Sequence, residues 1–482
     1  MNPIKNEFKP SLGLIDGTMI VAGSMIGSGI FIVSTDISRN VGSAGWLIIV
    51  WLITALMTIM AAVSYGELSG MYPKAGGQYV YLKEAFNPLA GFLYGWSSFT
   101  VIQTATIAAV GVAFSRFTAY LVPEVGENNI IFTLGHLNIS AAQLLAIALI
   151  VFLTYTNTRG IKGGKIIQNV FTTVKLLSLF GLIVAGFLFV KHSFWSENWQ
   201  TGFNAMQLEK ANGSFVLHGN WLPIGGTVLI GAVAASMVGS LFSSDAWNNV
   251  TFIAGEIKNP KRNIGLSLFL GTLIVSLVYI TMNLMYLNAL SLDQIAYPEG
   301  DRVAVAASTA VFGSAGAIVI AVMIMISTFG CNNGLILAGA RVYYTMAQDG
   351  LFFKQAARLN KNTVPQWALW AQCCVACILC LSGGYNDLLD MIAFVVVLFY
   401  VLTIIGIFVL RAKAPNAERP YKAFAYPILP GLYILLGIIF CVFLLIFKPA
   451  YTLWGLGIVL AGIPVYFIAI SSGKKSTGTN HE

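Results

Sequence analysis

Charged side chains are scarce in this chain. Of its 482 residues, 10% are Asp, Glu, Lys or Arg and 57% are hydrophobic, and the mean hydropathy is +0.78. Soluble globular proteins contain about 25% charged residues. Because one membrane-spanning helix needs about 20 apolar residues, the hydrophobic residues suffice for about a dozen such helices. The composition therefore excludes a water-soluble protein and leaves no room for a sizeable soluble domain.

Cysteine and histidine are also few, and their positions exclude most metal and redox chemistry. All 6 cysteines lie inside apolar runs, which argues against an exported disulfide framework. Cys373, Cys374, Cys377 and Cys380 are spaced like cluster ligands, but no His or acid lies nearby, so we expect them to pack as small hydrophobic residues. The 4 histidines form no metal spacing, and no phosphate loop or nucleophile elbow occurs. We therefore expect no cofactor, no metal and no enzymatic activity.

Long apolar runs, bounded by charge, Gly or Pro, predict twelve membrane-spanning helices. They lie near residues 12–35, 45–71, 88–121, 139–156, 164–190, 226–254, 264–291, 304–346, 364–382, 385–410, 426–447 and 450–471. The predicted fold class is therefore an all-α integral membrane protein.

Lys and Arg are distributed unevenly between the two sides of the predicted bundle. If the N-terminus is cytoplasmic, only five fall outside, namely Arg39, Lys191, Lys210, Arg302 and Lys448, and Arg116 and Lys175 lie within spans. The other 20 of the 27 are then cytoplasmic. Because cytoplasmic loops carry the excess of Lys and Arg, we predict a multi-pass protein of the cell membrane with both termini in the cytoplasm. This pattern also accounts for the net charge of +8 without a nucleic-acid partner.

The first predicted span is weakened by a run of small residues from Gly23 to Phe31. One interpretation is close helix packing, because Gly23 and Gly27 form a GxxxG pair. The other is a break in the helix, whose freed N–H groups could hold a carboxylate. The sixth span has a polar interruption at the corresponding place of a second set of five helices: Ser243, Ser244, Asp245, Trp247, Asn248 and Asn249. Interruptions in matching positions favour a transporter with a central substrate site.

Two ionisable residues are predicted at mid-depth in the membrane. Lys175 lies about eleven residues into its span, roughly 17 Å deep, so it cannot reach the interface easily. It is either permanently paired with a carboxylate or carbonyl cluster, or it has a lowered pKa and cycles its proton. Asp245 either pairs with Lys175 or faces a substrate amine. Arg116 and Asp390 are close enough to span ends to be structural, and Glu67 could belong to a gate, a hydrogen-bonding network or a solvated anchor.

Five stretches resemble the amino acid, polyamine and organocation superfamily of transporters, and within it the L-type amino-acid transporter branch. They occur in the family's order along most of the chain: Ile26-Gly27-Ser28-Gly29-Ile30-Phe31; Pro73-Lys74-Ala75-Gly76-Gly77-Gln78-Tyr79; Gln168-Asn169-Val170 through Lys175-Leu176-Leu177; Trp247 through Glu256-Ile257-Lys258-Asn259-Pro260; and Ser327-Thr328-Phe329-Gly330 with Asn333 and Arg341.

This resemblance implies a fold of five plus five inverted repeats, at residues 12–190 and 226–410, with two additional helices at 426–471. It also implies that backbone N–H groups around Ser28 and Gly29 bind the substrate carboxylate. The carbonyls around Met25 and Ile26, with Phe242 and Asp245, would take the ammonium, and Phe242 would be the aromatic gate. The candidate substrate-binding residues are Met25, Ile26, Gly27, Ser28, Gly29, Phe242, Ser243, Asp245 and Asn248. Lys175 is the candidate coupling residue, in the place where sodium-coupled relatives hold an ion.

The chain departs from the family pattern at two places. Asp245 stands where close relatives have a small residue, which would select a cationic or small polar substrate or add a proton site. Animal members pair with a heavy chain through a cysteine between the third and fourth spans, but residues 122–138 contain none. We therefore expect no disulfide-linked heavy chain.

These observations predict a sodium-independent amino-acid permease that works by alternating access. Its partners are the lipid bilayer, an amino-acid substrate and, in one version, protons. If Lys175 cycles a proton the mechanism is proton symport, and if it is a fixed surrogate cation the mechanism is exchange. The alternative function is a membrane receptor that binds amino acids without moving them; an integral-membrane enzyme lacks a convergent set of catalytic side chains.

Overall fold

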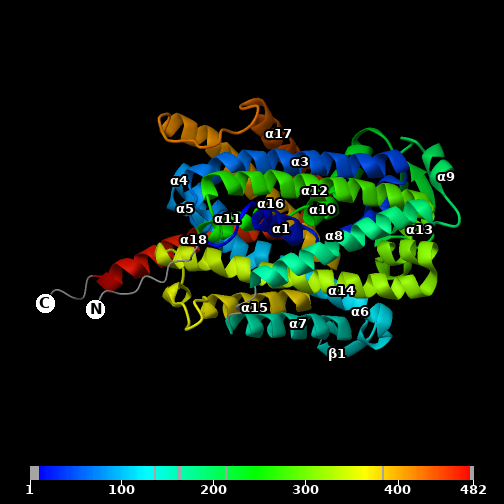
Figure 1. Cartoon of the computed structure of the whole chain (residues 1–482), viewed down its shortest axis with the longest axis horizontal. Coiled ribbons are helices and arrows are strands. Elements are labelled where there is room, and N and C mark those ends of the chain that lie inside the picture. Colours follow the sequence, from blue (N-terminus) through cyan, green and yellow to red (C-terminus); the bar gives the residue numbers. More distant parts are fainter. Residues whose placement is uncertain (1–9, 135–136, 160–163, 212–213, 383–384, 478–482) are drawn as a thin grey trace.

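The computed structural model describes the chain except for residues 1–9, 135–136, 160–163, 212–213, 383–384 and 478–482. The long helices run side by side along the long axis of the molecule (Figure 1). Within the described residues, nine helices are long and apolar enough to cross a membrane: Ala44–Met71, Pro88–Leu121, Ala141–Thr158, Phe171–Leu188, Gly226–Ser243, Pro260–Ala289, Val303–Gln348, Leu388–Lys413 and Ile428–Phe447. Three shorter apolar helices are Leu14–Met25, Gln366–Leu381 and Thr452–Ile468. The protein is thus a helical multi-pass membrane protein.

The structure contains α-helices from Leu14 onward, joined by connections of very different length. In chain order they are α1 (Leu14–Met25), α2 (Val33–Val41), α3 (Ala44–Met71), α4 (Gln78–Ala85), α5 (Pro88–Ser97), α6 (Gln103–Leu121), α7 (Ala141–Thr158), α8 (Gly164–Leu188), α9 (Trp195–Gln200), α10 (Gly226–Ser243), α11 (Asn249–Phe252), α12 (Pro260–Ala289), α13 (Leu292–Ala296), α14 (Val303–Gln348), α15 (Gln366–Ser382), α16 (Tyr385–Lys413), α17 (Ile428–Phe447) and α18 (Pro449–Thr477). Short 3₁₀ segments include η1 (Gly29–Phe31) and η5 (Glu299–Asp301), and η2 (Ser98–Ile102) is a π-helical turn.

Each of the predicted spans contains a helix of the structure, and both predicted interruptions are present. Residues 26–32 separate α1 from α2, and residues 244–248 separate α10 from α11. The longest predicted span is also divided, because Gly313 in α14 has non-helical angles of φ 74° and ψ −168°. A conformation of positive φ is accessible to glycine at little cost, so Gly313 kinks this helix.

The helix ends follow local sequence signals. The Ser43 hydroxyl accepts a hydrogen bond from the Trp46 N–H at the start of α3. Asn87 caps α5 in the same way, and Pro88 occupies its first position, where a missing N–H costs nothing. Ser140 and Gln143 form a reciprocal capping box at α7. These caps satisfy backbone donors that have no partner within their own helices.

Packing between distant segments builds the buried centre. Helix α3 packs along α12, and α14 packs along α6. The short helix α1 lies against α12 and α8, and α2 lies against α10. Helix α1 also contacts α11 and α14, and α10 contacts α3, α16 and α17. The interrupted helices are therefore surrounded by uninterrupted ones.

Short strands, which the all-α prediction did not include, occur in the loops. Strand β1 (Ile130–Leu134) pairs antiparallel with β2 (Leu137–Ser140), β3 (Met206–Leu208) with β6 (Trp221–Pro223), and β4 (Lys210–Ala211) with β5 (Ser214–Phe215). They lie outside the hydrophobic spans, where hairpin edges can contact water.

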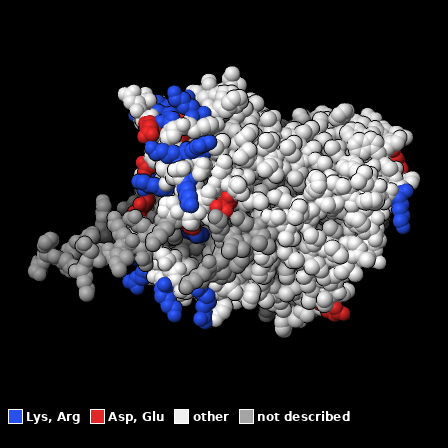
Figure 2. Space-filling model, viewed as in Figure 1, with Lys and Arg blue, Asp and Glu red and all other residues white. Residues whose placement is uncertain are grey.

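Most of the charged side chains visible in Figure 2 lie at one end of the molecule. Figure 2 shows most visible Lys and Arg side chains at the end that carries both termini, and a broad uncharged flank beyond them. Few charged side chains are visible at the opposite end, which carries α9 and α13. An uncharged flank of this kind is suited to contact with lipid.

Candidate functional site

The two interruptions meet at Gly29 and Ser243. A Cβ atom added to Gly29 would lie only 2.9 Å from the Ser243 Cα atom, so a side chain at residue 29 would collide with backbone. The hydroxyl oxygen of Tyr279 in α12 lies 3.0 Å from the Met25 carbonyl and 3.1 Å from the Ser243 carbonyl, and it donates to both. The glycine therefore permits close approach, and Tyr279 links the two breaks.

Lys175 of α8 places its ammonium group at the C-terminal end of α1. Its ammonium group is buried and donates to the carbonyls of Gly23, at 3.1 Å, and Ile26, at 3.0 Å. The last carbonyls of a helix have no partner within it and carry partial negative charge, so they compensate a cation. The structure thus gives Lys175 a carbonyl cluster as its partner. The side chains of the neighbouring motif residues Gln168, Asn169 and Val170 lie outside the described residues.

Asp245 is bonded to Tyr400 of α16 instead of Lys175. The Tyr400 hydroxyl donates to the Asp245 carboxylate. Two further rings surround this pair: Trp247 lies 5.0 Å from Tyr400 and 4.8 Å from Tyr65, measured between ring centroids. Among the described contacts, none joins Asp245 to Lys175. Asp245 and Lys175 thus have different hydrogen-bond partners.

Asp245 and Tyr400 stand between two small cavities. The first is largely apolar and is lined by α3, α10, α16 and α17, including Met57, Phe242, Ile392 and Tyr433. The second is lined by polar side chains of α4, α6 and the α10–α11 break: Gln78, Gln103, Thr106, Asn248 and Asn249. Each has a volume of about 20 Å³, room for about one water molecule. An amino acid needs more space, so this structure is closed around Asp245.

The π-helical turn η2 precedes the residues of the second cavity that come from α6. Gln103 and Thr106 follow it directly, and Thr104 donates to the carbonyl of Phe99, five residues earlier. Turns of this kind change the direction in which the following side chains point and recur at functional sites.

Asn248 belongs to a chain of amide and hydroxyl groups. Its Nδ2 donates to Gln78 Oε1 at 3.1 Å, and Gln78 Nε2 donates to the Thr403 hydroxyl at 3.1 Å. This chain connects the second interruption to α4 and α16. Asn248 therefore has a positioning contact as well as a place on the cavity wall.

The carbonyls expected to take the substrate ammonium already have donors. The Met25 carbonyl accepts from the Gly27 N–H, at 2.8 Å, and from Tyr279. The Ile26 carbonyl accepts from Lys175 and from the Ser327 hydroxyl, at 3.4 Å. A carbonyl has two lone pairs, so a substrate would have to displace or share these bonds.

The remaining predicted site residues are buried around the same breaks. Ser28 is fully buried and precedes η1, whose first N–H groups lack partners within that turn. A Cβ on Gly27 would lie 3.3 Å from Cys331 Sγ. Phe242 lines the first cavity beside Asp245, and the Ser243 hydroxyl donates to the Gly239 carbonyl at 2.7 Å.

Four residues near the breaks were not predicted: Tyr279, Tyr400, Gln78 and Thr403. Gln78 is part of a quoted motif, but the motif gave it no role. A tyrosine within an apolar run is the only sequence signal for Tyr279 and Tyr400, and it does not identify a partner.

Glu67 and Asp390, the acidic residues predicted near the ends of spans, form ion pairs with basic side chains. Glu67 is buried and accepts from Arg411, at 2.9 and 2.6 Å, and from the Ala423 N–H, at 2.7 Å, with Arg419 at 3.3 Å. It thus belongs to a hydrogen-bonding network. Asp390 pairs with Lys448 at 2.7 Å.

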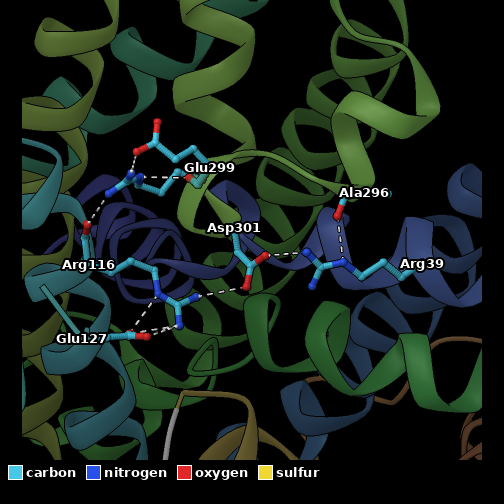
Figure 3. A network of polar contacts seen from close by, with 7 residues as sticks. Arg39, Arg116, Glu127, Ala296, Glu299 and Asp301 are labelled. Carbon is cyan, nitrogen blue, oxygen red and sulfur yellow. Dashed lines mark hydrogen bonds and ion pairs between the residues drawn. The ribbon is translucent and has the colours of Figure 1, made fainter. Parts of the chain in front are cut away.

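Asp301 lies between two arginines (Figure 3), beside α13 at the end of the molecule shown on the right of Figure 1. Its carboxylate is 2.7 Å from Arg39 and 3.9 Å from Arg116, and Arg116 also pairs with Glu127 at 3.0 Å. Arg39 donates in addition to the Ala296 carbonyl at 2.7 Å. The network joins α2, α6, α13 and η5.

Comparison with known proteins shows which family the sequence matches. The family described as amino acid permease matches residues 12–452. The chain is 28% identical over 472 residues to the b(0,+)-type amino acid transporter 1 of Mus musculus, covering 96% of this chain and 88% of the relative. It is 29% identical over 466 residues to the large neutral amino acids transporter small subunit 2 of Homo sapiens, covering 96% and 81%.

Proposed function

The chain belongs to the amino acid permease family, and on that premise we propose that it is a secondary-active permease that moves amino acids across the plasma membrane by alternating access, without sodium. It is a transporter and not an enzyme. The observation that carries the proposal is the meeting of the two interrupted helices at Gly29 and Ser243, beside a carboxylate at mid-depth.

The proposed architecture has twelve spans arranged as five plus five inverted repeats. The nine long helices and the three shorter ones supply that number among the described residues. The first repeat comprises residues 12–190, the second 226–410, and two additional helices 426–471. The interruptions support this division, because each lies in the first helix of its repeat.

The proposed substrate site has two ends. Backbone N–H groups around Ser28 and Gly29 bind the carboxylate, since an anion is favoured at the start of a helical segment. The Asp245 carboxylate binds an amine and releases Tyr400 as it does so. Phe242 closes the site. The carbonyls of Met25 and Ile26, with Gly27, Ser243 and Asn248, form the surrounding walls.

Asp245 also supports a preference for cationic or small polar amino acids. A carboxylate between two cavities attracts an amine in the side chain of the substrate. The wall of the second cavity also supplies amides and hydroxyls from Gln103, Thr106 and Asn249. An apolar side chain would offer no partner to the carboxylate or to the unpaired amide nitrogen of Asn249, which disfavours it.

Lys175 supports sodium independence, because its ammonium group occupies the carbonyl cluster at the end of α1. If this cation stays fixed, the transport mode is exchange. If Lys175 loses its proton during the cycle, the mode is proton symport. The two carbonyl bonds favour the fixed cation, since both bind the charged form.

The proposed orientation places both termini in the cytoplasm of the cell. The concentration of Lys and Arg at the end with the termini supports it (Figure 2). One relative is named a small subunit. We propose that this chain works without a disulfide-linked heavy chain, because residues 122–138 contain no cysteine.

Reconstituted protein tests the proposed function. Proteoliposomes loaded with unlabelled amino acids should take up a labelled amino acid, and a competition panel should rank cationic and small polar amino acids first. Uptake should persist when sodium is replaced by choline. Exchange predicts that uptake requires internal amino acid, whereas proton symport predicts uptake driven by an inward proton gradient alone. Saturable binding without flux would instead identify a receptor.

A further inference from the structure

A third cavity lies between α2, α10 and α16, toward the end of the molecule that carries α13. It has a volume of about 20 Å³, and its polar lining comprises Thr35, Asp36, Ser236, Asp301, Asp390 and Lys448, with Arg39 at its rim. It is separate from the two cavities beside Asp245, because they share no lining residue with it. Thr35 lies six residues beyond Gly29, and Ser236 seven before Ser243. At 1.5 Å per helical residue, these two residues are about 10 Å from Gly29 and Ser243, while Ile32 of the lining belongs to the first break.

Two hydroxyl groups in this cavity are buried without a hydrogen-bond partner. Thr35 and Ser236 are each 1% exposed, and neither Thr35 Oγ1 nor Ser236 Oγ has a partner. Buried polar side chains are nearly always hydrogen-bonded, because leaving them unpaired costs free energy. Two such groups lining one cavity indicate a bound species that supplies the missing bonds.

The charges of the cavity favour a cation. Three carboxylates line it against two cations, and the two cations are occupied: Arg39 binds Asp301 at 2.7 Å and Lys448 binds Asp390 at 2.7 Å. Figure 3 shows the first of these pairs. None of the ion pairs among the described residues includes Asp36, which is contacted by Asn40 at 3.5 Å and interacts electrostatically with Lys210. Arg116 also contacts Asp301, at 3.9 Å, so Asp36 is the carboxylate of this lining that has no ion pair among the described residues.

We propose that this cavity binds a primary ammonium group. An ammonium has three N–H donors and no acceptor, and the cavity offers the hydroxyl oxygens of Thr35 and Ser236 and the carboxylate of Asp36. The group is about as large as the single water molecule that the volume accommodates.

The position of the cavity gives the site a role that rests on the proposed function. It lies along α2 and α10, between the outer end of the molecule and the breaks. An amino acid on its way to Asp245 would therefore bind here first through its ammonium group. The same chemistry would also hold a free amine that lacks a carboxylate. The two sources differ in whether an amino acid competes for the site.

Binding of methylammonium to the purified full chain tests the site without a transport assay. This probe has only the ammonium group, and saturation-transfer NMR detects weak binding in nanodiscs. Wild type and Asp245→Asn should both bind it. Thr35→Val and Ser236→Ala should each weaken binding by about 3- to 10-fold, which corresponds to one lost hydrogen bond. Asp36→Asn should reduce binding more strongly.

The hydroxyl variants are expected to fold, because each removes an unpaired buried oxygen. Their thermal unfolding without ligand should be unchanged or shifted upward, and a Thr281→Val control, which removes an exposed hydroxyl on α12, should bind normally. Displacement of the probe by alanine would identify an amino acid as the source, and displacement by cadaverine alone would identify a free amine. The proposal is overturned if the three variants bind like wild type, if only Asp245→Asn loses binding, or if tetramethylammonium or sodium displaces the probe equally well.

Discussion

The ammonium nitrogen of Lys175 lies 3.0 Å from the carbonyl oxygen of Ile26, at the point where α1 ends. This side chain of α8 thus stabilises the interruption between α1 and α2. The lysine both satisfies carbonyls that the break exposes and places a positive charge in the protein interior. Removing it should affect the geometry of the break and the charge at the same time.

Lys175→Met should lower amino-acid uptake by at least about 10-fold, because it leaves the Gly23 and Ile26 carbonyls without their charged donor, a loss of about 1.5–3 kcal/mol per bond. Measuring uptake into proteoliposomes as a function of pH tests this loss of activity. Lys175→Arg keeps the charge and should retain part of the activity if the cation is fixed. Unchanged uptake and pH dependence in Lys175→Met would show that Lys175 has no coupling role.

Asp245→Asn should shift the substrate profile from cationic or small polar amino acids toward neutral ones. The charge is lost while the size of the side chain is kept. Competition against a labelled substrate measures the profile, and about 10-fold weaker inhibition by cationic amino acids is expected. Tyr400→Phe removes the carboxylate's hydroxyl partner but keeps its charge, so cationic selectivity should remain. An identical profile in Asp245→Asn would exclude this residue from the site.

Gly29→Ala should impair both folding and transport. The added Cβ lies 2.9 Å from Ser243 Cα, and overpacking of this kind costs about 1–3 kcal/mol. The matched control is Gly181→Ala in α8, where nothing lies within 4 Å of the added atom. Thermal unfolding in detergent and uptake should both distinguish the pair. Equal behaviour of the two variants would mean that the breaks do not require close contact.

Glu67→Gln should destabilise the protein by about 3–5 kcal/mol, because it leaves Arg411 and Arg419 without a buried partner. Glu418→Gln is the control, since Glu418 is 76% exposed and pairs with the exposed Lys261. That substitution should change stability by less than about 1 kcal/mol. Thermal unfolding of the two purified variants tests the difference. A small effect at Glu67 would contradict the structural importance of this network.

The helices and both interruptions could be predicted because their signals are local. Apolar runs of membrane length give the spans, and glycine or polar residues within them mark places where a continuous helix is weak. The depth of Lys175 in the membrane stays a prediction, made by counting residues along its helix. By contrast, the loop strands are too short to show a clear alternation of polar and apolar residues in the sequence.

The partners of the mid-depth charges could not be predicted. Tyr400 is 155 positions from Asp245 in the chain, and Lys175 is 149 from Ile26, so each contact depends on which helices pack together. The carboxylate and the lysine are both conspicuous in the sequence, but nothing local indicates that one binds a phenol and the other binds carbonyls. The three cavities likewise arise between helices that are distant in the chain.

The hydroxyl of Tyr279 has a single proton, although two carbonyls lie within 3.1 Å of it. While the breaks stay together, both carbonyls share that proton. If α1 and α10 separate during transport, Tyr279 can follow only one of them. The Met25 carbonyl would still accept from the Gly27 N–H, whereas the Ser243 carbonyl would lose the donor that Tyr279 supplies. Tyr279 thus favours a separation in which it stays with α10, unless a water molecule or a substrate N–H takes its place at the Ser243 carbonyl.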